Sequence, residues 1–165
     1  MDDRAFCAML FQIRQLCDQA SAQFIINDRI DLALASGADG VHLGQTDLPV
    51  DIARRLLGKD AIIGVSTHNR IQFLEAQKMD VDYVAIGPIY ETGTKASPFP
   101  PLSHSFIEEV VELKQHSLVA IGGISLKTAF RVWEAGADSI AVISDIIDAP
   151  NPGQRISEYL RLSRK

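Results

Sequence analysis

Two aspartates stand just beyond two short apolar runs and could bind a metal ion. Asp28 follows the run at 24–26, and Asp47 follows the run at 40–43. If these runs are neighbouring parallel strands, the two carboxylates emerge at one edge of a sheet, where α/β proteins place their chemistry. Two carboxylates suit Mg²⁺, which keeps water or phosphate oxygens at its remaining positions.

Helix capping is the alternative for both residues. Asp28 could cap a helix starting near Arg29, and Asp47 could cap, or turn into, a helix starting near Val50. Caps are far commoner than metal ligands, so the two aspartates taken alone favour capping. The rest of the chain reverses that preference.

Two further segments predict a binding site for an anion. Gly122-Gly123-Ile124 follow one apolar run, and Ile143-Ser144 follow the next. Backbone N–H groups at strand ends that lead into helices bind anions, and the last two strands of a barrel are the usual phosphate position. The alternative is that the two glycines only make a tight turn.

A long stretch at 88–103 is rich in Gly, Pro and Thr, as expected for a functional or mobile loop. It contains Thr92-Gly93-Thr94-Lys95, in which two hydroxyls, a flexible glycine and a lysine could close over an anionic ligand. A solvated turn is the alternative.

Three other polar residues lie in or near predicted strands. Ser66 ends a strand and His68 follows it, so each could face the mouth of the site or cap the next helix. His42 lies inside a strand, where a packed, hydrogen-bonded core histidine is expected.

Alternating strands and helices predict an α/β fold. The segments 35–44, 78–87 and 134–144 each run from a helix end through an aspartate into an apolar strand, and apolar runs this continuous indicate parallel strands. The predicted strands are 23–27, 39–43, 61–65, 81–86, 118–122 and 138–143, and the predicted helices are 4–20, 29–36, 50–57, 69–79, 104–116, 126–135 and 153–163. The pattern favours a TIM-type (β/α) barrel, with a doubly wound sheet as the alternative.

Length and composition exclude several classes of protein. A chain of 165 residues with 47% hydrophobic and 22% charged residues predicts one globular domain over residues 1–165. No apolar run reaches ~18 residues and the start is not basic, so neither a membrane span nor a signal peptide is expected. A net charge of −5 argues against a nucleic-acid partner. Cys7 and Cys17 stand too far apart on one predicted helix to form a disulfide, so a cytoplasmic location is expected.

Together these residues resemble the thiamine phosphate synthases and their relatives, the thiazole tautomerases. Six motifs match in order: Asn27-Asp28, Asp39-Gly-Val-His-Leu-Gly-Gln-x-Asp47, Gly64-Val-Ser66, Gly87-Pro-Ile … Thr92-Gly-Thr-Lys95, Ile121-Gly-Gly-Ile124 and Ala141-Val-Ile-Ser144. One such motif would be weak evidence, and six collinear ones are strong.

The resemblance implies a set of site residues and a reaction. Asp28 and Asp47 would be Mg²⁺ ligands, while Asn27, Ser66 and Lys95 would contact hydroxymethylpyrimidine diphosphate, with Ser66 and Lys95 as catalytic residues. The residues implied for thiazole phosphate are Thr92, Gly93, Thr94, Gly123, Ile143 and Ser144. The implied transferase joins these two phosphorylated heterocycles with loss of diphosphate, and the metal and the lysine stabilise the departing charge.

The chain departs from the family's pattern near its start. The family's barrel has eight strands, so the six predicted here lack the first two, the second of which carries a Gln-x-Arg-x-Lys motif that grips the diphosphate. Gln12-Ile13-Arg14 resembles part of that motif, but Leu16 replaces the lysine and the triplet lies in a predicted helix. We therefore reject it as the motif. Strand edges left open at 23–27 and 138–143 favour a homo-oligomer.

Three functions follow from this pattern. The first is a synthase-type transferase with reduced activity. The second is a thiazole tautomerase-like isomerase using His68 for proton transfer, although the two aspartates and the segment 92–95 fit the synthase better. The third is a non-catalytic protein that binds a phosphate ligand.

Overall fold

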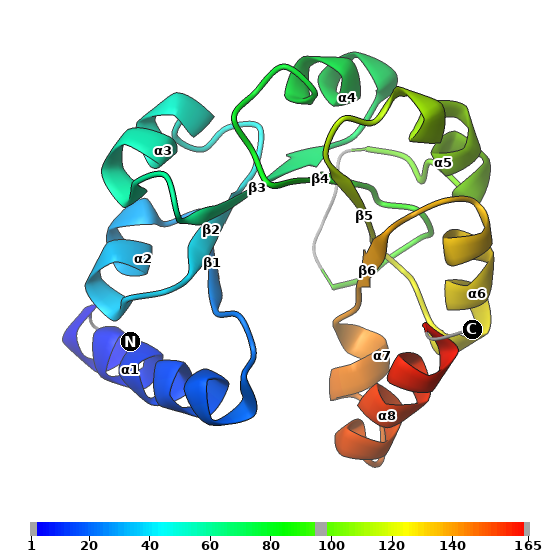
Figure 1. The fold of residues 1–165 in the computed structure, drawn as a ribbon. Helices are drawn as coiled ribbons and strands as arrows, with labels where there is room; N and C mark the ends of the chain where they lie inside the picture. The colour runs from blue at the N-terminus through cyan, green and yellow to red at the C-terminus, as the bar shows by residue number, and fades with distance from the viewer. Residues whose placement is uncertain (1–2, 95–98, 164–165) are drawn as a thin grey trace. The chain divides into compact units, whose positions relative to one another are not determined.

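The computed structural model describes residues 3–94 and 99–163, in which strands and helices alternate along the chain (Figure 1). Contacts divide the chain into two compact units, one comprising residues 1–66 and 79–82 and the other residues 67–78 and 83–165. The single domain expected over residues 1–165 stays a prediction.

The first unit contains three parallel strands in chain order. Its elements are α1 (Asp3–Ala20), β1 (Ile25–Asn27), α2 (Ile30–Ser36), β2 (Gly40–Leu43), α3 (Val50–Leu57) and β3 (Ile62–Thr67), of which Thr67 belongs to the second unit. β1 pairs with β2 and β2 with β3, and α2 and α3 pack against this sheet. Val41, Leu43 and Ile63 are buried in its core because the apolar strands are covered by these helices.

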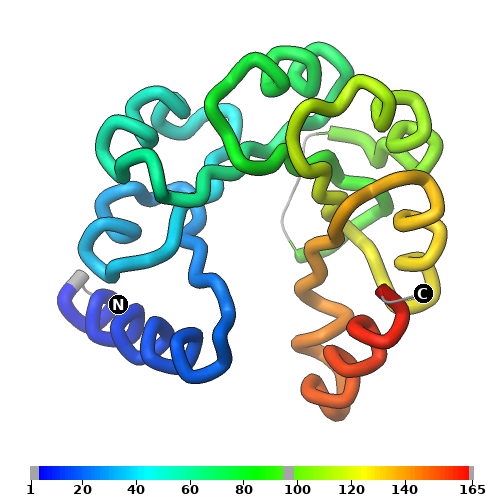
Figure 2. Tube along the Cα trace, in the orientation of Figure 1, coloured from blue at the N-terminus to red at the C-terminus, as the bar shows by residue number. Residues whose placement is uncertain are grey.

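The second unit repeats the same alternation, as the trace in Figure 2 shows. Its elements are α4 (Arg70–Ala76), β4 (Tyr83–Ile86), α5 (His104–Val110), a 3₁₀ turn η1 (Val111–Leu113), β5 (Ser117–Ile121), α6 (Leu126–Glu134), β6 (Ser139–Ala141), α7 (Ser144–Ile147) and α8 (Pro152–Leu162). β4 pairs with β5 and β5 with β6, all in parallel. Its buried core includes Phe73, Ile86 and Leu118.

The six predicted strands and seven predicted helices are confirmed, with small changes at their ends. The helix predicted over 104–116 ends at Val110 and continues as η1, and the helix predicted over 69–79 ends at Ala76. The four-residue helix α7 was not predicted, because one turn is too short to show a helical period. Within residues 3–94 and 99–163, no helix is long and apolar enough to cross a membrane.

An aspartate at the start of a strand binds the first residues of the preceding strand. Asp39 Oδ2 accepts a hydrogen bond from the Phe24 N–H at 2.6 Å, and the Asp39 N–H donates to the Phe24 carbonyl at 2.8 Å. The same two bonds join Asp82 to Ile63, at 2.8 and 2.8 Å, and Asp138 to Leu118, at 2.8 and 2.9 Å. We call these three pairs the aspartate clamps. They explain why the three similar sequence segments share an aspartate.

Each clamp also carries a basic side chain from a distant part of the chain. Arg14 lies 2.7 Å from the Asp39 carboxylate, Arg54 lies 3.0 Å from that of Asp82, and Lys114 lies 2.6 Å from that of Asp138. The partner of Asp39 is the arginine of the Gln12-Ile13-Arg14 triplet, which lies within α1. Its rejection as a diphosphate-binding motif is therefore supported by the contact that Arg14 makes.

Replacing Asp39 with alanine should lower the free energy of unfolding by about 1–2 kcal/mol. The loss is that of charge-assisted hydrogen bonds, reduced by solvent screening because the side chain is 39% exposed. D39N keeps an oxygen that can accept the Phe24 N–H bond and should lose less. Urea denaturation measures both values, and a D39A midpoint equal to that of wild type would contradict a stabilising clamp.

The clamps should also make the free energy of unfolding depend on pH in the acidic range. The backbone hydrogen bond from Phe24, and then Arg14, hold the pKa of Asp39 below its ordinary value. The pKa of Asp138 is likewise lowered, since the bonds from Leu118 and Lys114 outweigh the opposing effect of burial. This stabilisation is complete above the unfolded-state pKa of about 3.9 and is lost as the pH falls through the folded-state pKa.

The stability advantage of wild type over D39N should therefore shrink as the pH is lowered from about 5 to about 3. Urea midpoints of the two proteins across this range measure it. A constant advantage would show that the Asp39 charge does not contribute.

Candidate active site

Asn27 and Asp28 lie exposed at the carboxyl end of β1. The Asp28 N–H donates to the His42 carbonyl at 2.8 Å, and the Arg29 N–H donates to the Asn27 carbonyl at 2.7 Å. This tight turn holds Asp28 at φ 66°, a left-handed conformation that aspartate and asparagine adopt more often than other residues with a side chain. Arg29 occupies the N-cap position of α2, so Asp28 is not the cap residue that the alternative interpretation required.

Asp47 lies half-buried in the loop after β2. Its Oδ2 accepts a hydrogen bond from the Gly44 N–H at 2.6 Å, and its own N–H donates to the Gly44 carbonyl at 3.3 Å. The N-cap of α3 is Pro49, which makes no side-chain capping bond. Asp47 therefore closes the turn 44–47 through one carboxylate oxygen and does not occupy the cap of α3.

The two aspartates thus follow the carboxyl ends of two strands, β1 and β2, that pair directly. Their oxygens are the hard donors that Mg²⁺ prefers. Among residues 3–94 and 99–163, no group of three or more His, Cys, Asp or Glu side chains could hold a metal ion.

Ser66 forms a polar cluster with two residues from β2 and its following loop. His42 Nε2 lies 2.8 Å from Ser66 Oγ, and the Gln45 side-chain amide donates to the Ser66 carbonyl at 2.6 Å. His42 is half-buried and hydrogen-bonded, as expected for a histidine inside a strand. The sequence did not predict that its partner would be a candidate site residue, because the bond spans 24 positions.

His68 holds both ends of the long loop. Its Nδ1 lies 2.6 Å from the Gly87 carbonyl oxygen, and its ring stacks on Phe99 with centroids 4.1 Å apart. A carbonyl oxygen only accepts, so Nδ1 carries the proton and Nε2 of the neutral ring is the acceptor. His68 does not cap α4, because the N-cap residue of that helix is Asn69.

Gly122 and Gly123, which follow β5, lie against the start of the long loop. The Ile89 N–H donates to the Ile121 carbonyl at 2.9 Å, and the Tyr90 N–H donates to that of Gly122 at 3.0 Å. A Cβ on Gly123 would lie 2.3 Å from the Glu91 carbonyl oxygen, and Gly123 has φ 62°. The two glycines are therefore required by this close approach, which brings the segment leading to Thr92 beside Gly123.

The thiazole-phosphate candidates lie beyond the paired parts of their strands. β5 ends at Ile121 and β6 at Ala141, so Gly123, Ile143 and Ser144 follow the last paired residues. Ile143 and Ser144 are exposed. In the loop, Thr92 Oγ1 accepts a bond from the Thr94 N–H at 3.3 Å, and Thr94 and Gly93 are exposed. Lys95 lies outside the described residues.

A cluster that the sequence did not predict stands next to Ser144. Asp145 Oδ2 accepts bonds from Arg155 Nη1 at 2.6 Å, from the Tyr159 hydroxyl at 2.7 Å and from the Leu126 N–H at 3.3 Å. Burial opposes ionisation, but the bonds from Arg155, Tyr159 and Leu126 lower the pKa of Asp145, while burial raises the pKa of Tyr159. The only sequence signal is that Arg155 and Tyr159 stand four residues apart on one helix face.

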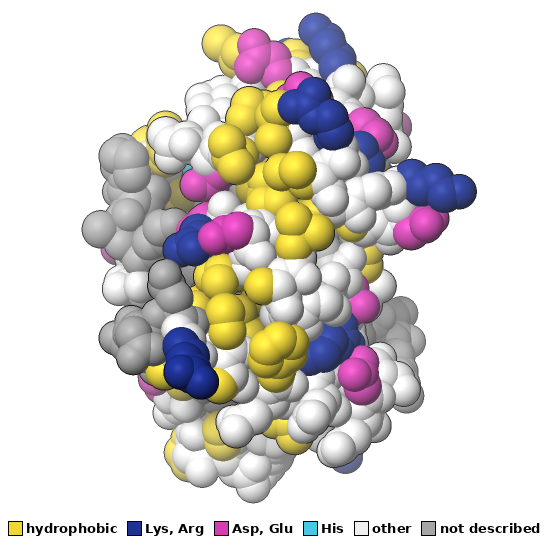
Figure 3. Space-filling view, turned by 90° about the vertical axis from the view of Figure 1, so that its left-hand side faces the viewer, with side chains coloured by type: hydrophobic (Ala, Val, Ile, Leu, Met, Phe, Trp, Pro, Cys, Tyr) yellow, Lys and Arg dark blue, Asp and Glu magenta, His cyan; other side chains and the backbone are white. Residues whose placement is uncertain are grey.

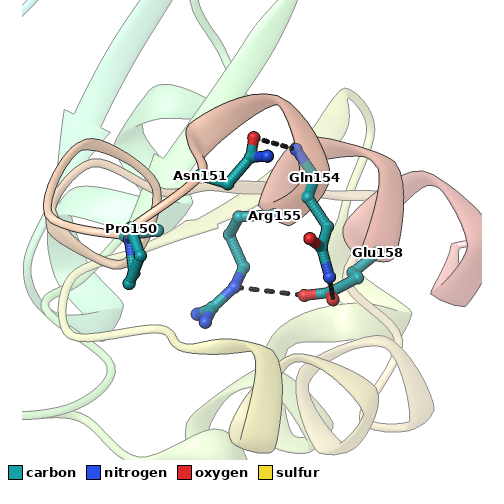
Figure 4. A pocket seen from close by; sticks show the side chains of 6 residues that line it. Pro150, Asn151, Gln154, Arg155 and Glu158 are labelled. Atoms are coloured by element: carbon teal, nitrogen blue, oxygen red, sulfur yellow. Dashed lines mark hydrogen bonds and ion pairs between the residues drawn. The ribbon is translucent and has the colours of Figure 1, made fainter.

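A surface pocket lies beside this cluster, at the turn from α7 to α8 (Figure 4). It is lined by Ala149, Pro150, Asn151, Gln154, Arg155 and Glu158. None of the site residues predicted from the sequence lines it. Its polar groups are largely used within α8, since Asn151 caps the Gln154 N–H at 3.0 Å and Glu158 binds Arg155 at 3.2 Å.

Parallel strands that alternate with helices, with polar residues beyond the strands' carboxyl ends, define an α/β protein of the TIM-type class. The family model for thiamine monophosphate synthase matches residues 1–146. The chain is 50% identical over 149 residues to the thiamine-phosphate synthase of Chlorobium phaeovibrioides, covering 90% of this chain and 71% of that protein. It is 48% identical over 151 residues to the thiamine-phosphate synthase of Synechococcus sp., covering 92% of this chain but 42% of that longer protein.

Among solved structures, the thiamine phosphate pyrophosphorylase from Pyrococcus furiosus matches with a TM-score of 0.89 and 32% identity, covering 99% of this chain and 78% of that one. The TIM-type fold class predicted from the sequence is thereby confirmed. The chain belongs to the thiamine monophosphate synthase family, whose members are transferases of thiamine biosynthesis.

Replacing Gly123 with alanine should destabilise the second unit and displace the start of the long loop. The new Cβ would meet the Glu91 carbonyl at 2.3 Å in a conformation unfavourable to side chains, which costs about 1–3 kcal/mol or more. Thermal unfolding followed by circular dichroism measures the loss. The control is G93A, since a Cβ on Gly93 meets nothing within 4 Å and φ there is not positive; equal melting temperatures for the two variants would contradict the packing role of Gly123.

Proposed function

We propose that this chain acts as a thiamine phosphate synthase on hydroxymethylpyrimidine diphosphate and thiazole phosphate. The observation that carries the proposal is that residues from separate family motifs all stand at the carboxyl ends of their strands. Asn27 ends β1 and Asp28 follows it, Asp47 follows β2, and Ser144 follows β6. This is the end of the strands at which TIM-type barrels carry out their chemistry.

Asp28 and Asp47 are the proposed Mg²⁺ ligands. Support comes from their positions, because Asp28 and Asp47 follow the carboxyl ends of β1 and β2, two strands that pair directly. Neither aspartate is the N-cap residue of the helix that follows it. When bound, Mg²⁺ would neutralise charge that develops on the diphosphate oxygens.

Asn27 and Ser66 are the proposed contacts to the pyrimidine. The Ser66 hydroxyl shares a hydrogen bond with His42, so the tautomer of His42 decides whether that hydroxyl is left to donate or to accept. Lys95, which lies outside the described residues, is the proposed cation for the leaving group. In the reaction, the bond from the pyrimidine methylene to oxygen breaks, diphosphate leaves with the electron pair, and the thiazole nitrogen bonds to the methylene carbon.

Thiazole phosphate is proposed to lie against Thr92, Gly93, Thr94, Gly123, Ile143 and Ser144. The contact between the loop and the glycines supports this grouping, because it places the segment before Thr92 directly against Gly123. Ile143 and Ser144 are exposed and lie beyond Ala141, the last residue of β6 that pairs with β5, as an anion site at a strand end requires.

Arg14 is not proposed as a contact to the diphosphate. It is the arginine of the Gln12-Ile13-Arg14 triplet in α1, and it is bound to Asp39 and Asp18 at 2.7 Å each.

The chain should bind both thiazole phosphate and the pyrimidine diphosphate, and it should release diphosphate when it is given the two together. Isothermal titration calorimetry measures the two affinities, and release of diphosphate measures turnover. Added Mg²⁺ should strengthen binding of the pyrimidine diphosphate. The matched variants are D28N and D47N, which should abolish this effect of Mg²⁺ and leave the affinity for thiazole phosphate unchanged, because asparagine tolerates the left-handed conformation at position 28.

Two results would contradict the proposal. Failure of the wild-type chain to bind thiazole phosphate would remove the substrate assignment. A Mg²⁺ effect that survives in both D28N and D47N would remove the metal assignment. The tautomerase alternative gains no support from the relatives, which are named synthases.

We propose a homo-oligomer in the cytoplasm. Figure 3 shows a band of hydrophobic side chains on one face of the molecule. Helices of the first unit expose large apolar residues, among them Phe11, Leu34 and Leu56, each about half exposed. Contiguous apolar surface of this kind is typical of an interface between protein chains.

A further inference from the structure

Asp145 is the most connected polar side chain next to the proposed phosphate site. One oxygen, Oδ2, accepts bonds from Arg155, Tyr159 and the backbone of Leu126, at 2.6, 2.7 and 3.3 Å. Only 22% of its side chain and 27% of that of Arg155 are exposed. The carboxylate is therefore held in place by α8 and is not a mobile surface group.

The position of Asp145 links the two segments that carry the proposed phosphate contacts. Asp145 directly follows Ser144, while Leu126 is the first residue of α6 and stands three positions after Gly123. The bond from the Leu126 N–H to Asp145 thus fixes the end of the β5 segment relative to the end of the β6 segment. A change in this carboxylate would alter the spacing of Gly123 and Ser144.

The same carboxylate creates an electrostatic problem for anion binding. Consecutive Cα atoms are about 3.8 Å apart, so a phosphate held at Ser144 would lie within reach of the Asp145 charge. The bonds that lower the pKa of Asp145 keep it ionised at neutral pH. A phosphate next to an unpaired carboxylate is repelled, and the positive group that removes the repulsion is Arg155.

Arg155 is also contacted by a second carboxylate. Its Nε lies 3.2 Å from Glu158, as the dashed line in Figure 4 shows, while its Nη1 lies 2.6 Å from Asp145. Glu158 is more exposed, at 34%, and it also accepts a bond from the Gln154 side chain at 3.0 Å. The shorter and less exposed contact is the one to Asp145, so Arg155 chiefly neutralises the carboxylate beside Ser144.

We propose that Arg155 is a positioning residue for the phosphate site and that it permits anion binding by neutralising Asp145. This inference rests on the proposed function, since it takes thiazole phosphate as the ligand of Gly123, Ile143 and Ser144. Arg155 itself acts through Asp145 and does not contact the ligand. Its pairing with Asp145 makes the affinity for phosphate depend on a residue of α8.

The test compares the affinities of three variants for thiazole phosphate by isothermal titration calorimetry. R155Q leaves the Asp145 charge unpaired and should weaken binding roughly tenfold, an effect that added salt should reduce by screening. D145N/R155Q removes both charges, keeps an oxygen for Tyr159 and Leu126, and should bind within about threefold of wild type. R161Q removes an exposed arginine from the same helix and should bind as wild type does.

The recovery in D145N/R155Q separates neutralisation from the other roles of Arg155. If the double variant binds as weakly as R155Q, Arg155 attracts the phosphate directly or only supports the fold, and the inference is overturned. Equal affinities of R155Q and wild type also overturn it. Failure of wild type to bind thiazole phosphate would instead refute the proposed function, and the inference with it.

A further control tests whether weak binding by R155Q results from poor folding. R155K keeps the positive charge but not the planar guanidinium, and it should bind within about threefold of wild type. Circular dichroism melting of each variant shows whether it is folded at the temperature of the titration. Tenfold weaker binding by a folded R155K would show that the geometry of the guanidinium matters and not its charge, which would contradict neutralisation.

Discussion

The aspartate clamp is the interaction on which the arrangement of the site depends. In each clamp one residue uses both its backbone N–H and its carboxylate on a single residue of the preceding strand, as Asp39 does on Phe24. Two bonds to the same residue leave one possible register, because a shift by one position would break both. The clamp stands at the amino end of the strands, yet it decides which residues emerge together at the carboxyl end.

The consequence for the site follows from strand length. With Ile25 aligned to Gly40, the end of β1 at Asn27 aligns with His42, so Asp28 begins its turn beside β2 and binds the His42 carbonyl. In the second unit, the clamp between Asp138 and Leu118 accompanies the alignment of Ile121 with Ala141. Gly123 and Ile143 therefore each stand two positions past the aligned pair. The hydrogen bond from the Leu126 N–H to Asp145 then connects the segments that follow β5 and β6, at the carboxyl ends of these strands.

Local patterns in the sequence predicted the strands and most helices, and they placed most candidate residues at the carboxyl ends of the correct strands, although Ser66 lies inside β3, which extends to Thr67. They did not predict the clamps, because Asp39, Asp82 and Asp138 stand 15, 19 and 20 positions after the residues that they bind. For the same reason Arg14 could be rejected as a diphosphate ligand only by its place in a helical pattern, and its real partner became visible in the fold. The pairing of His42 with Ser66 and the cluster around Asp145 are likewise contacts between elements. A periodic pattern records which face of an element is apolar, and it carries no information about such pairs.

The glycines and Asp28 show how differently a motif can be explained once the backbone is known. Gly123 is required by packing, since any side chain there would collide with the loop at Glu91, so its presence does not need a phosphate. Asp28 is the reverse case. Its backbone is left-handed, a conformation that aspartate tolerates, and it is exposed and is not the N-cap of α2. The backbone therefore permits an aspartate there without requiring one, and the proposed Mg²⁺ role rests on the chemistry of the carboxylate. Asp47 differs, because its carboxylate already closes a turn at Gly44.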